Sequence, residues 1–280
     1  ESSYLTYGET AYINSFPKEF SLPEVEPFIS EYPGVVSIKG VDTLFIGINA
    51  NQDYFMGVYS LNTGKKLLDL FKRGQGPGEY ISSPRVQKFH VSNDSILASM
   101  IYNHAKETFT LDLKESIKRG HEVIVDKSHP VFFSDVKDLI PLNEGDSLMI
   151  CRNFRKGGFD KYILRHDNTR KKLKLRHLEP DLSEIDHNIV STLPLLFKND
   201  SCVAEACISI NQINIYSLND TMYHKTICVG TSLDDIGKLN QASNRDIPRT
   251  YGGVQSWNDK LIFLYLSLIH ISEPTRPISI

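Results

Sequence analysis

A short turn signal recurs five times along the chain and sets a repeat of roughly fifty residues. Each copy carries an aspartate followed by a short β-rich run, and the aspartates are Asp42, Asp94, Asp146, Asp200 and Asp259. Successive aspartates are separated by 52, 52, 54 and 59 residues. An aspartate accepts hydrogen bonds from nearby backbone N–H groups and tolerates tight turns. We therefore interpret each copy as the hairpin between two strands of a repeated unit.

A second turn follows each aspartate by 17 to 20 residues, so that each repeat has room for four short strands. In the second repeat we place the strands at 85–91, 95–101, 106–113 and 121–126. No twelve-residue stretch has a clear helical period, and Leu182 to Ser191 allows one short helical turn at most. Four-stranded units of this length predict an all-β propeller, because stacked blades bury the faces of each sheet. A β-sandwich is the alternative, although it requires no such repeat.

The repeat count predicts about four and a half blades within a single domain that covers 1–265. We expect an N-terminal segment at 1–33, blades near 34–80, 81–133, 134–186 and 187–245, and a partial blade at 246–265. A complete propeller of this kind would have six blades. In closed propellers an N-terminal strand often completes the last blade. We expect that partner to be missing here, which would leave an open ring with exposed strand edges.

The last fifteen residues depart from the repeat. The string from Leu266 to Arg276 reads like the in-frame translation of a sequencing adapter. We therefore expect 266–280 to be a non-native tail, and we expect no third and fourth strand of the fifth blade there. A short native tail is the alternative.

Composition excludes several functions. Hydrophobic residues make up 40% of the chain and charged residues 23%, with a net charge of −3, which is ordinary for a globular protein. Without an overall basic field we expect no nucleic-acid partner. The four cysteines lack C-x-x-C spacing, and we interpret them as small buried hydrophobes. No run of 18 apolar residues predicts a membrane span. Since the sequence opens at Glu1, we expect any targeting segment to lie upstream of it.

One loop has a distinctive sequence, Gly74-Gln75-Gly76-Pro77-Gly78-Glu79-Tyr80, followed by Ser83-Pro84. It lies between the last strand of one repeat and the first strand of the next. Glycines permit positive φ and close approach of backbones, and the proline stiffens the loop. We interpret the loop as a staple between blades. Contact of its N–H groups with an anionic ligand is the alternative. The loop is no Walker phosphate loop, because Gly-Lys-Ser/Thr is missing.

This motif resembles the G-x-G-P-G-E-[FY] loop of TolB-like six-bladed propellers, which are secreted or lipid-anchored proteins of Gram-negative bacteria. NHL-repeat propellers carry a looser form. The segments Tyr59 to Lys65, Tyr251 to Val254 and Leu261 to Tyr265 add weaker similarity, so that the resemblance covers about 34–265. It implies a location in the periplasm or at the cell surface, and membrane attachment only through an N-terminal lipid anchor. The family shares no catalytic motif.

Catalytic signatures are not evident in the sequence. The nine histidines have no H-E-x-x-H or H-x-x-E-H spacing, and no G-x-S-x-G elbow occurs. The recurrent aspartates repeat with the fold, which favours a structural role. We therefore expect no catalytic residue, no cofactor and no metal, although a metal site assembled from different blades is the alternative to this.

Loops that join the second and third strands should share a face with the loops between blades. We expect polar ligands to bind there, and the candidate residues are Arg73, Gln75, Glu79, Tyr80, Asp53, Tyr102, Asn103, His104, Arg152, Asn153 and Arg155. The alternative is that these residues only form turns. We predict a non-catalytic binding propeller whose partner is a polymer or protein: a glycan, a peptide or a partner protein. A lyase or hydrolase with its site at the channel mouth is the alternative, which a cluster of histidine with aspartate or glutamate would favour.

Overall fold

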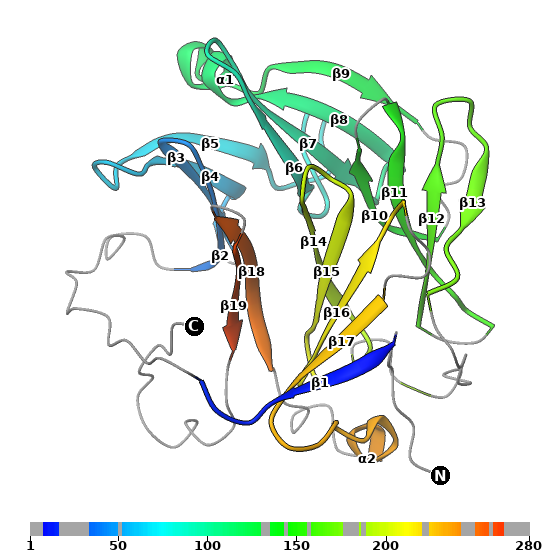
Figure 1. Cartoon of the computed structure of the whole chain (residues 1–280). Helices are drawn as coiled ribbons and strands as arrows, with labels where there is room; N and C mark the ends of the chain where they lie inside the picture. Colours follow the sequence, from blue (N-terminus) through cyan, green and yellow to red (C-terminus); the bar gives the residue numbers. More distant parts are fainter. Residues whose placement is uncertain are drawn as a thin grey trace. The chain divides into compact units, whose positions relative to one another are not determined.

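The computed structural model describes residues 8–16, 34–49, 52–129, 135–142, 145–155, 158–175, 185, 189–219, 224–241, 250–257 and 260–265. Within these residues the secondary structure is almost entirely β (Figure 1). The strands form four sheets of at least four strands and a further pair, and most strands lie beside their neighbours in the chain. This up-and-down order within repeated sheets is the architecture of propeller blades.

The first two blades are antiparallel throughout, and each follows the order of the chain. Blade 1 consists of β2 (Val35–Val41), β3 (Leu44–Asn49), β4 (Tyr54–Ser60) and β5 (Lys66–Lys72). Blade 2 consists of β6 (Arg85–Val91), β7 (Ile96–Tyr102), β8 (Glu107–Asp112) and β9 (Ile124–Ser128). The four strands expected in the second repeat thus lie within a few residues of their predicted bounds.

The later blades repeat this plan. Blade 3 consists of β10 (Val136–Pro141), β11 (Ser147–Arg152), β12 (Phe159–Leu164) and β13 (Arg170–Lys172). Blade 4 consists of β14 (Thr192–Phe197), β15 (Cys202–Cys207), β16 (Gln212–Ser217) and β17 (His224–Val229). The partial blade is a pair of strands, β18 (Tyr251–Trp257) and β19 (Lys260–Tyr265). The predicted fold class, an all-β propeller with about four and a half blades present, is confirmed.

The recurrent aspartates occupy equivalent turns. Asp42, Asp94, Asp146 and Asp200 each lie between the first and second strands of a blade, as predicted. Asp42 and Asp200 have left-handed backbones, with φ of 52° and 63°, which aspartate tolerates better than most residues. Asp259 and the tail at 266–280 lie outside the described residues. The six-bladed ring and the single domain remain predictions.

The N-terminal strand corrects one expectation. We expected its partner to be missing, but β1 (Glu9–Ile13) pairs in parallel with β17 and makes blade 4 five-stranded. The outer edge of β17 offers unpaired backbone groups to any extended segment that reaches it. The chain just before β1 approaches β17 so closely that position 8 requires glycine, because a Cβ on Gly8 would lie 2.4 Å from the carbonyl oxygen of His224.

Two short helices were not predicted. Helix α1 (Leu113–Arg119) lies between β8 and β9, where the sequence indicated only a turn, and α2 is Ile236–Gln241. Asp112 caps the N-terminus of α1 by accepting a hydrogen bond from Glu115 N at 3.0 Å, and Gly120 ends the helix with φ of 75°. These are ordinary helix signals, although seven residues are too few to show a period. No helix in the described ranges is both long and apolar enough to cross a membrane.

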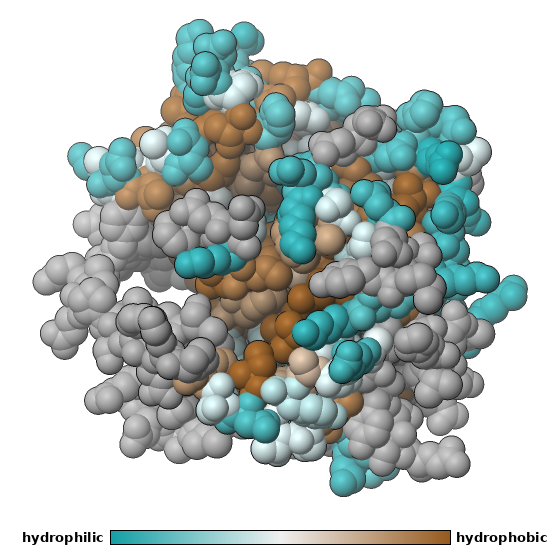
Figure 2. All heavy atoms as spheres, in the orientation of Figure 1, coloured by the Kyte–Doolittle hydropathy of each residue, from teal (hydrophilic) through white to brown (hydrophobic). Residues whose placement is uncertain are grey.

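The chain divides into two compact units. The first unit comprises Glu1–Pro23, Cys151–Ile163 and Arg170–Ile280, and the second comprises Glu24–Ile150 and Leu164–Thr169. The hydrophobic core of the second unit runs through blades 1 and 2. Figure 2 shows that both hydrophilic and hydrophobic side chains reach the visible surface, and scattered exposed residues such as Leu67 and Val125 are normal for a globular protein.

A buried ion pair crosses the interior of the first unit. Lys161 Nζ on β12 lies 3.0 Å from Glu205 Oε2 on β15, and the two side chains are 4% and 0% exposed. The hydroxyl of Tyr216 on β16 donates to the other carboxylate oxygen at 2.8 Å. Each oxygen of the carboxylate therefore has a polar partner, as a buried carboxylate requires.

We expect Lys161→Met to destabilise the protein by about 3–5 kcal/mol, because it leaves the Glu205 carboxylate buried without its cation. The double variant Lys161→Met/Glu205→Leu should recover most of this loss, since it removes both charges. Urea unfolding measures both effects through the transition midpoint. Equal destabilisation by the single and double variants would show that packing, and not the charge, controls stability here.

Candidate functional site

The loop from Gly74 to Tyr80, here called the glycine loop, closes around the carboxylate of its own Glu79. Tyr80 N donates to Lys72 O at 2.8 Å, and Gly74 N donates to Tyr80 O at 3.1 Å, so the ends of the loop are held together. Within the loop, Gly76 N donates to Glu79 Oε2 at 2.9 Å. Lys72 Nζ lies 2.8 Å from Glu79 Oε1. The loop thus turns its N–H groups onto an internal anion.

The glycine at position 74 makes room for this carboxylate. A Cβ on Gly74 would lie 1.8 Å from Glu79 Oε2. The hydrogen bond from Lys72 lowers the pKa of Glu79, and the backbone N–H groups of Gly76 and Gln75 lower it further. The geometry therefore supports the interpretation of the loop as a staple. The Gln75 side chain is exposed.

Aromatic side chains pack the glycine loop against blade 2. The rings of Tyr80 and Tyr102 meet edge to face at 5.0 Å, and the Tyr102 hydroxyl accepts a hydrogen bond from Ile81 N at 3.1 Å. The ring of Phe71 packs against Tyr80 at 5.0 Å. Burial raises the pKa of Tyr80 to about 12, so its hydroxyl stays protonated. Tyr102 is only 6% exposed, which makes it a packing residue.

Arg73 and Asp53 join the loop to blade 1. Arg73 N donates to Asp53 O at 2.7 Å, and the Arg73 guanidinium donates to Asn49 O at 2.5 Å. The same guanidinium lies 3.8 Å from the centre of the Phe55 ring. The Asp53 side chain is exposed. The structure therefore brings Asp53, Arg73, Glu79 and Tyr80 together, but Arg73 is already engaged within the fold.

The remaining predicted residues fall into two sets. In the second unit, Asn103 Nδ2 donates to Val136 O at 2.9 Å, and His104 is exposed beside the Tyr102 ring. Arg152, Asn153 and Arg155 belong to the first unit. In that unit the Arg152 guanidinium lies 5.0 Å from the centre of the Phe154 ring.

The loop that carries Asn153 holds itself by local hydrogen bonds. Asn153 Nδ2 donates to Asp160 Oδ2 at 3.0 Å, and Arg155 N donates to Asn153 Oδ1 at 3.1 Å. The candidates are thus distributed over the two compact units, and the expectation that they share one polar face remains a prediction. Whether any of these residues binds a ligand remains a prediction.

A cation-rich cluster on the first strands was missed by the sequence analysis. It consists of Lys39 on β2, Arg85 and Lys88 on β6, and Lys137 and Asp138 on β10. We call it the first-strand cluster. Its signal was present as charged residues within the first strand of three successive repeats. The sequence located the first strands but not the contacts that their side chains make with the next blade, so these residues were not grouped.

Contacts within the first-strand cluster link each blade to the next. Lys39 Nζ donates to Val86 O at 2.7 Å, and Lys88 Nζ donates to Pro141 O at 3.2 Å. Arg85 Nη1 lies 3.3 Å from Asp138 Oδ1. These bonds explain how blades 1, 2 and 3 are held in register at their first strands.

The first-strand cluster contains four basic residues and a single carboxylate. Burial lowers the pKa of Lys39, and the nearby Arg85 lowers it further, while Asp138 raises it. Arg85 keeps 39% of its side chain exposed and Lys137 keeps 22%. An ammonium group has three donors, and a guanidinium has five. The partly exposed Arg85 guanidinium has more donors than its printed contacts with the fold use, so it is the group of the cluster best suited to contact an anion.

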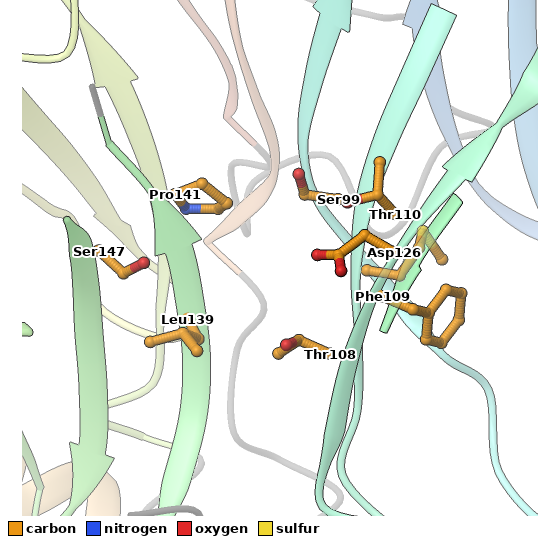
Figure 3. Close-up of a pocket in the computed structure, with 9 residues that line it drawn as sticks. Ser99, Thr108, Phe109, Thr110, Asp126, Leu139, Pro141 and Ser147 are labelled. Atoms are coloured by element: carbon orange, nitrogen blue, oxygen red, sulfur yellow. The ribbon is translucent and has the colours of Figure 1, made fainter. Parts of the chain in front are cut away.

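A pocket of about 130 Å³ lies between blades 2 and 3 in the second unit (Figure 3). Ser99, Thr108, Thr110 and Asp126 lie along one side, and Leu139, Pro141 and Ser147 lie along the other. Met100 and Phe109 complete the lining. No sequence motif marked this pocket, because strand register brings its residues together.

Metal chemistry finds no support in the part of the chain that the structure describes. No group of three or more histidine, cysteine, aspartate or glutamate side chains there could hold a metal ion. His166 lies 3.6 Å from Asp146, but its side chain is 76% exposed and stands in a turn. A positioned acid, base and nucleophile set is likewise not evident among these residues.

The sequence matches no protein-family model and no curated protein. A protein of Bacteroides fragilis described as exported has a similar structure, with 13% identity over 92% of this chain and 73% of its own, and a TM-score of 0.53. Virginiamycin B lyase from Staphylococcus aureus has 12% identity over 82% of this chain and 62% of its own, with a TM-score of 0.40. The β-propeller domain of a Myceliophteria thermophila protein has 10% identity, coverages of 84% and 63%, and a TM-score of 0.43. The chain spans less than two thirds of the last two, and the likeness to the first concerns the fold alone.

We expect Gly74→Ala to lower stability more than Gly78→Ala, although both glycines have positive φ. A Cβ at Gly78 meets nothing within 4 Å, so its cost is backbone strain alone, about 1–2 kcal/mol. A Cβ at Gly74 must also displace the Glu79 carboxylate from its hydrogen bonds. Urea unfolding compares the two variants. The difference between them should shrink when Glu79→Ala is added to both; a difference that persists would contradict the staple.

We expect the stabilising effect of Glu79 to depend on pH in one direction. Since the fold lowers the pKa of Glu79 below its ordinary value of 4.5, its contribution is present above that value. It is lost as pH falls through the lowered pKa. The difference in melting temperature between the parent and Glu79→Gln should therefore be largest near neutral pH and should shrink below about pH 4. Lys72→Gln should show the same trend, and a difference that grows in acid would overturn the assignment.

Proposed function

We propose that this chain is a non-catalytic binding propeller that holds an anionic polymer on the first-strand cluster. The carrying observation is that Lys39, Arg85 and Lys137 lie near Asp138, on the first strands of three successive blades. Lys88 adds a fourth basic residue on β6 and donates to Pro141 O on β10. Cations on successive strands favour binding of an extended anion by several weak contacts rather than turnover of a small molecule.

The charge pattern favours binding over catalysis. A lyase or hydrolase needs an acid or base within hydrogen-bond reach of the substrate, with a second group to orient it. The first-strand cluster contains no histidine, and its Asp138 already faces Arg85 at 3.3 Å. The expected sign of a channel-mouth enzyme, histidine with a carboxylate, is therefore not found among the described residues of this cluster.

We propose an extracytoplasmic location and membership of the TolB-like six-bladed propellers on the basis of the glycine loop. Its sequence resembles that family, and its geometry uses each feature of the motif: the glycines for close approach, the glutamate for closure of the loop and the aromatic residue for packing. The description of the similar Bacteroides fragilis protein as exported agrees with this location. A complete ring of six blades belongs to the same proposal.

We expect Arg85→Gln/Lys88→Gln to weaken binding of polygalacturonate at least tenfold, because two cations of the cluster are lost. The matched control is Lys65→Gln/Lys118→Gln, which makes the same change of charge at exposed positions in blades 1 and 2. It should change the dissociation constant less than twofold. Asp138→Asn should instead strengthen binding, since it removes the carboxylate of the cluster. Calorimetric titration at two salt concentrations measures these effects, with polyglutamate as a second anionic probe.

Three results would overturn this proposal. The first is that the parent protein binds neither probe. The second is that both double variants weaken binding equally, which would indicate a general effect of net charge. The third is that the parent cleaves the polymer and a single substitution abolishes the cleavage, which would establish the enzyme alternative.

A further inference from the structure

We infer that the pocket between blades 2 and 3 is a separate binding site for one neutral sugar ring. Its polar side consists of hydroxyl groups and one carboxylate, and its opposite side contains Leu139 and Pro141 (Figure 3). Sugars have the same two characters, because their edges carry hydroxyl groups and their ring faces carry C–H groups. This inference concerns different residues from the first-strand cluster and does not rest on the proposed function.

Strand register places the polar side chains in a row. Ser99 on β7 is paired with Thr110 on β8, and Thr110 is paired with Asp126 on β9. Paired residues on neighbouring strands point to the same face with Cβ atoms about 5 Å apart. The row thus presents two hydroxyl groups and a carboxylate at a spacing that a single sugar ring can bridge.

A β-bulge produces this alignment. The register of β8 and β9 shifts between Thr110 and Leu111, since Leu111 pairs with Ile124 and Thr110 pairs with Asp126. Val125 is left as the extra residue and is 54% exposed. Bulges redirect side chains and are common beside binding sites. With regular pairing beyond Thr110, the chain leading to Asp126 would lie differently against blade 3.

These polar groups are not used by the fold. Among the described residues, the side chains of Ser99, Thr110, Asp126 and Ser147 make no hydrogen bond or ion pair with the protein. In contrast, the neighbouring Thr108 hydroxyl bonds to the Ser128 hydroxyl at 2.9 Å. Four unengaged polar groups around one pocket are available to a ligand that both donates and accepts hydrogen bonds.

Size and charge select the class of ligand. A volume of about 130 Å³ is well below the roughly 300–1,000 Å³ of pockets for drug-sized ligands, so the site accommodates one ring and not several. The Asp126 carboxylate favours hydroxyl donors and repels anions. A single carboxylate is also too few for a calcium site, which takes six to eight oxygen ligands with several charges. A neutral monosaccharide, free or at the end of a glycan, fits these conditions.

The test uses a panel of methyl glycosides of glucose, galactose and mannose, with saturation-transfer NMR and calorimetric titration as readouts. We expect at least one glycoside to bind, and we expect Asp126→Asn and Thr110→Val each to weaken it at least tenfold. Asp94→Asn is the matched control, because it makes the same change at an exposed turn of the same blade and should leave affinity unchanged. Comparison of the glycoside with a short glycan ending in the same sugar shows which source is preferred.

Cross-controls separate this site from the first-strand cluster. Lys39→Gln, which removes a basic residue of the cluster that contacts β6 and not the pocket lining, should keep glycoside binding, and Asp126→Asn should keep binding of polygalacturonate. Circular dichroism and urea unfolding confirm that each variant is folded. Absence of binding across the panel, equal loss in Asp94→Asn, or binding of calcium in place of the sugar would each overturn the inference.

Discussion

Burial of sheet faces is the constraint on which the rest of this structure depends. A four-stranded antiparallel sheet has two faces, and each loses stability if it remains in water. In the second unit the faces of blades 1 and 2 share one core, in which Met56, Leu70, Met100 and Leu111 are at most 1% exposed. At about 25 cal/mol per Å² of apolar area, this shared core outweighs any single polar contact. Each repeat of about fifty residues adds one blade, whose sheet face covers the face of the blade before it.

Apolar faces alone would allow one blade to slide against the next, and polar contacts at the first strands prevent this. Lys39 reaches a carbonyl of β6, and Arg85, Gln87 and Lys88 reach groups of β10. Gln87 also accepts a hydrogen bond from Leu139 N at 3.1 Å. Each contact fixes one strand against a specific residue of the next. The glycine loop performs the same task at the blade junction, with the internal Glu79 carboxylate in place of a ligand.

Features of this protein that depend on local sequence could be predicted, whereas features that depend on distant parts of the chain could not. The turns at Asp42, Asp94 and Asp146 were predictable because their geometry is local and the repeat confirms each copy. Helix α1 was missed although Asp112 and Gly120 mark its ends, since seven residues, about two turns, are too few to show a helical period. The pairing of β1 with β17 depends on an edge two hundred residues away in the chain. The pocket depends on the bulge at Val125, which no local signal announces.

Strand β10 contributes to both of the proposed binding surfaces. Its Asp138 meets Arg85, and the next residue, Leu139, lines the pocket. Each surface also keeps the charge suited to it: four basic residues and one carboxylate in the first-strand cluster, and a lone carboxylate in the pocket. We therefore expect an anionic ligand to prefer the cluster over the pocket. A neutral sugar has the reverse preference, because it gains hydrogen bonds from the pocket and little from bare charge. A glycan with both acidic and neutral residues could contact the two surfaces in turn, and its affinity would then exceed that of either part through linkage of the two contacts.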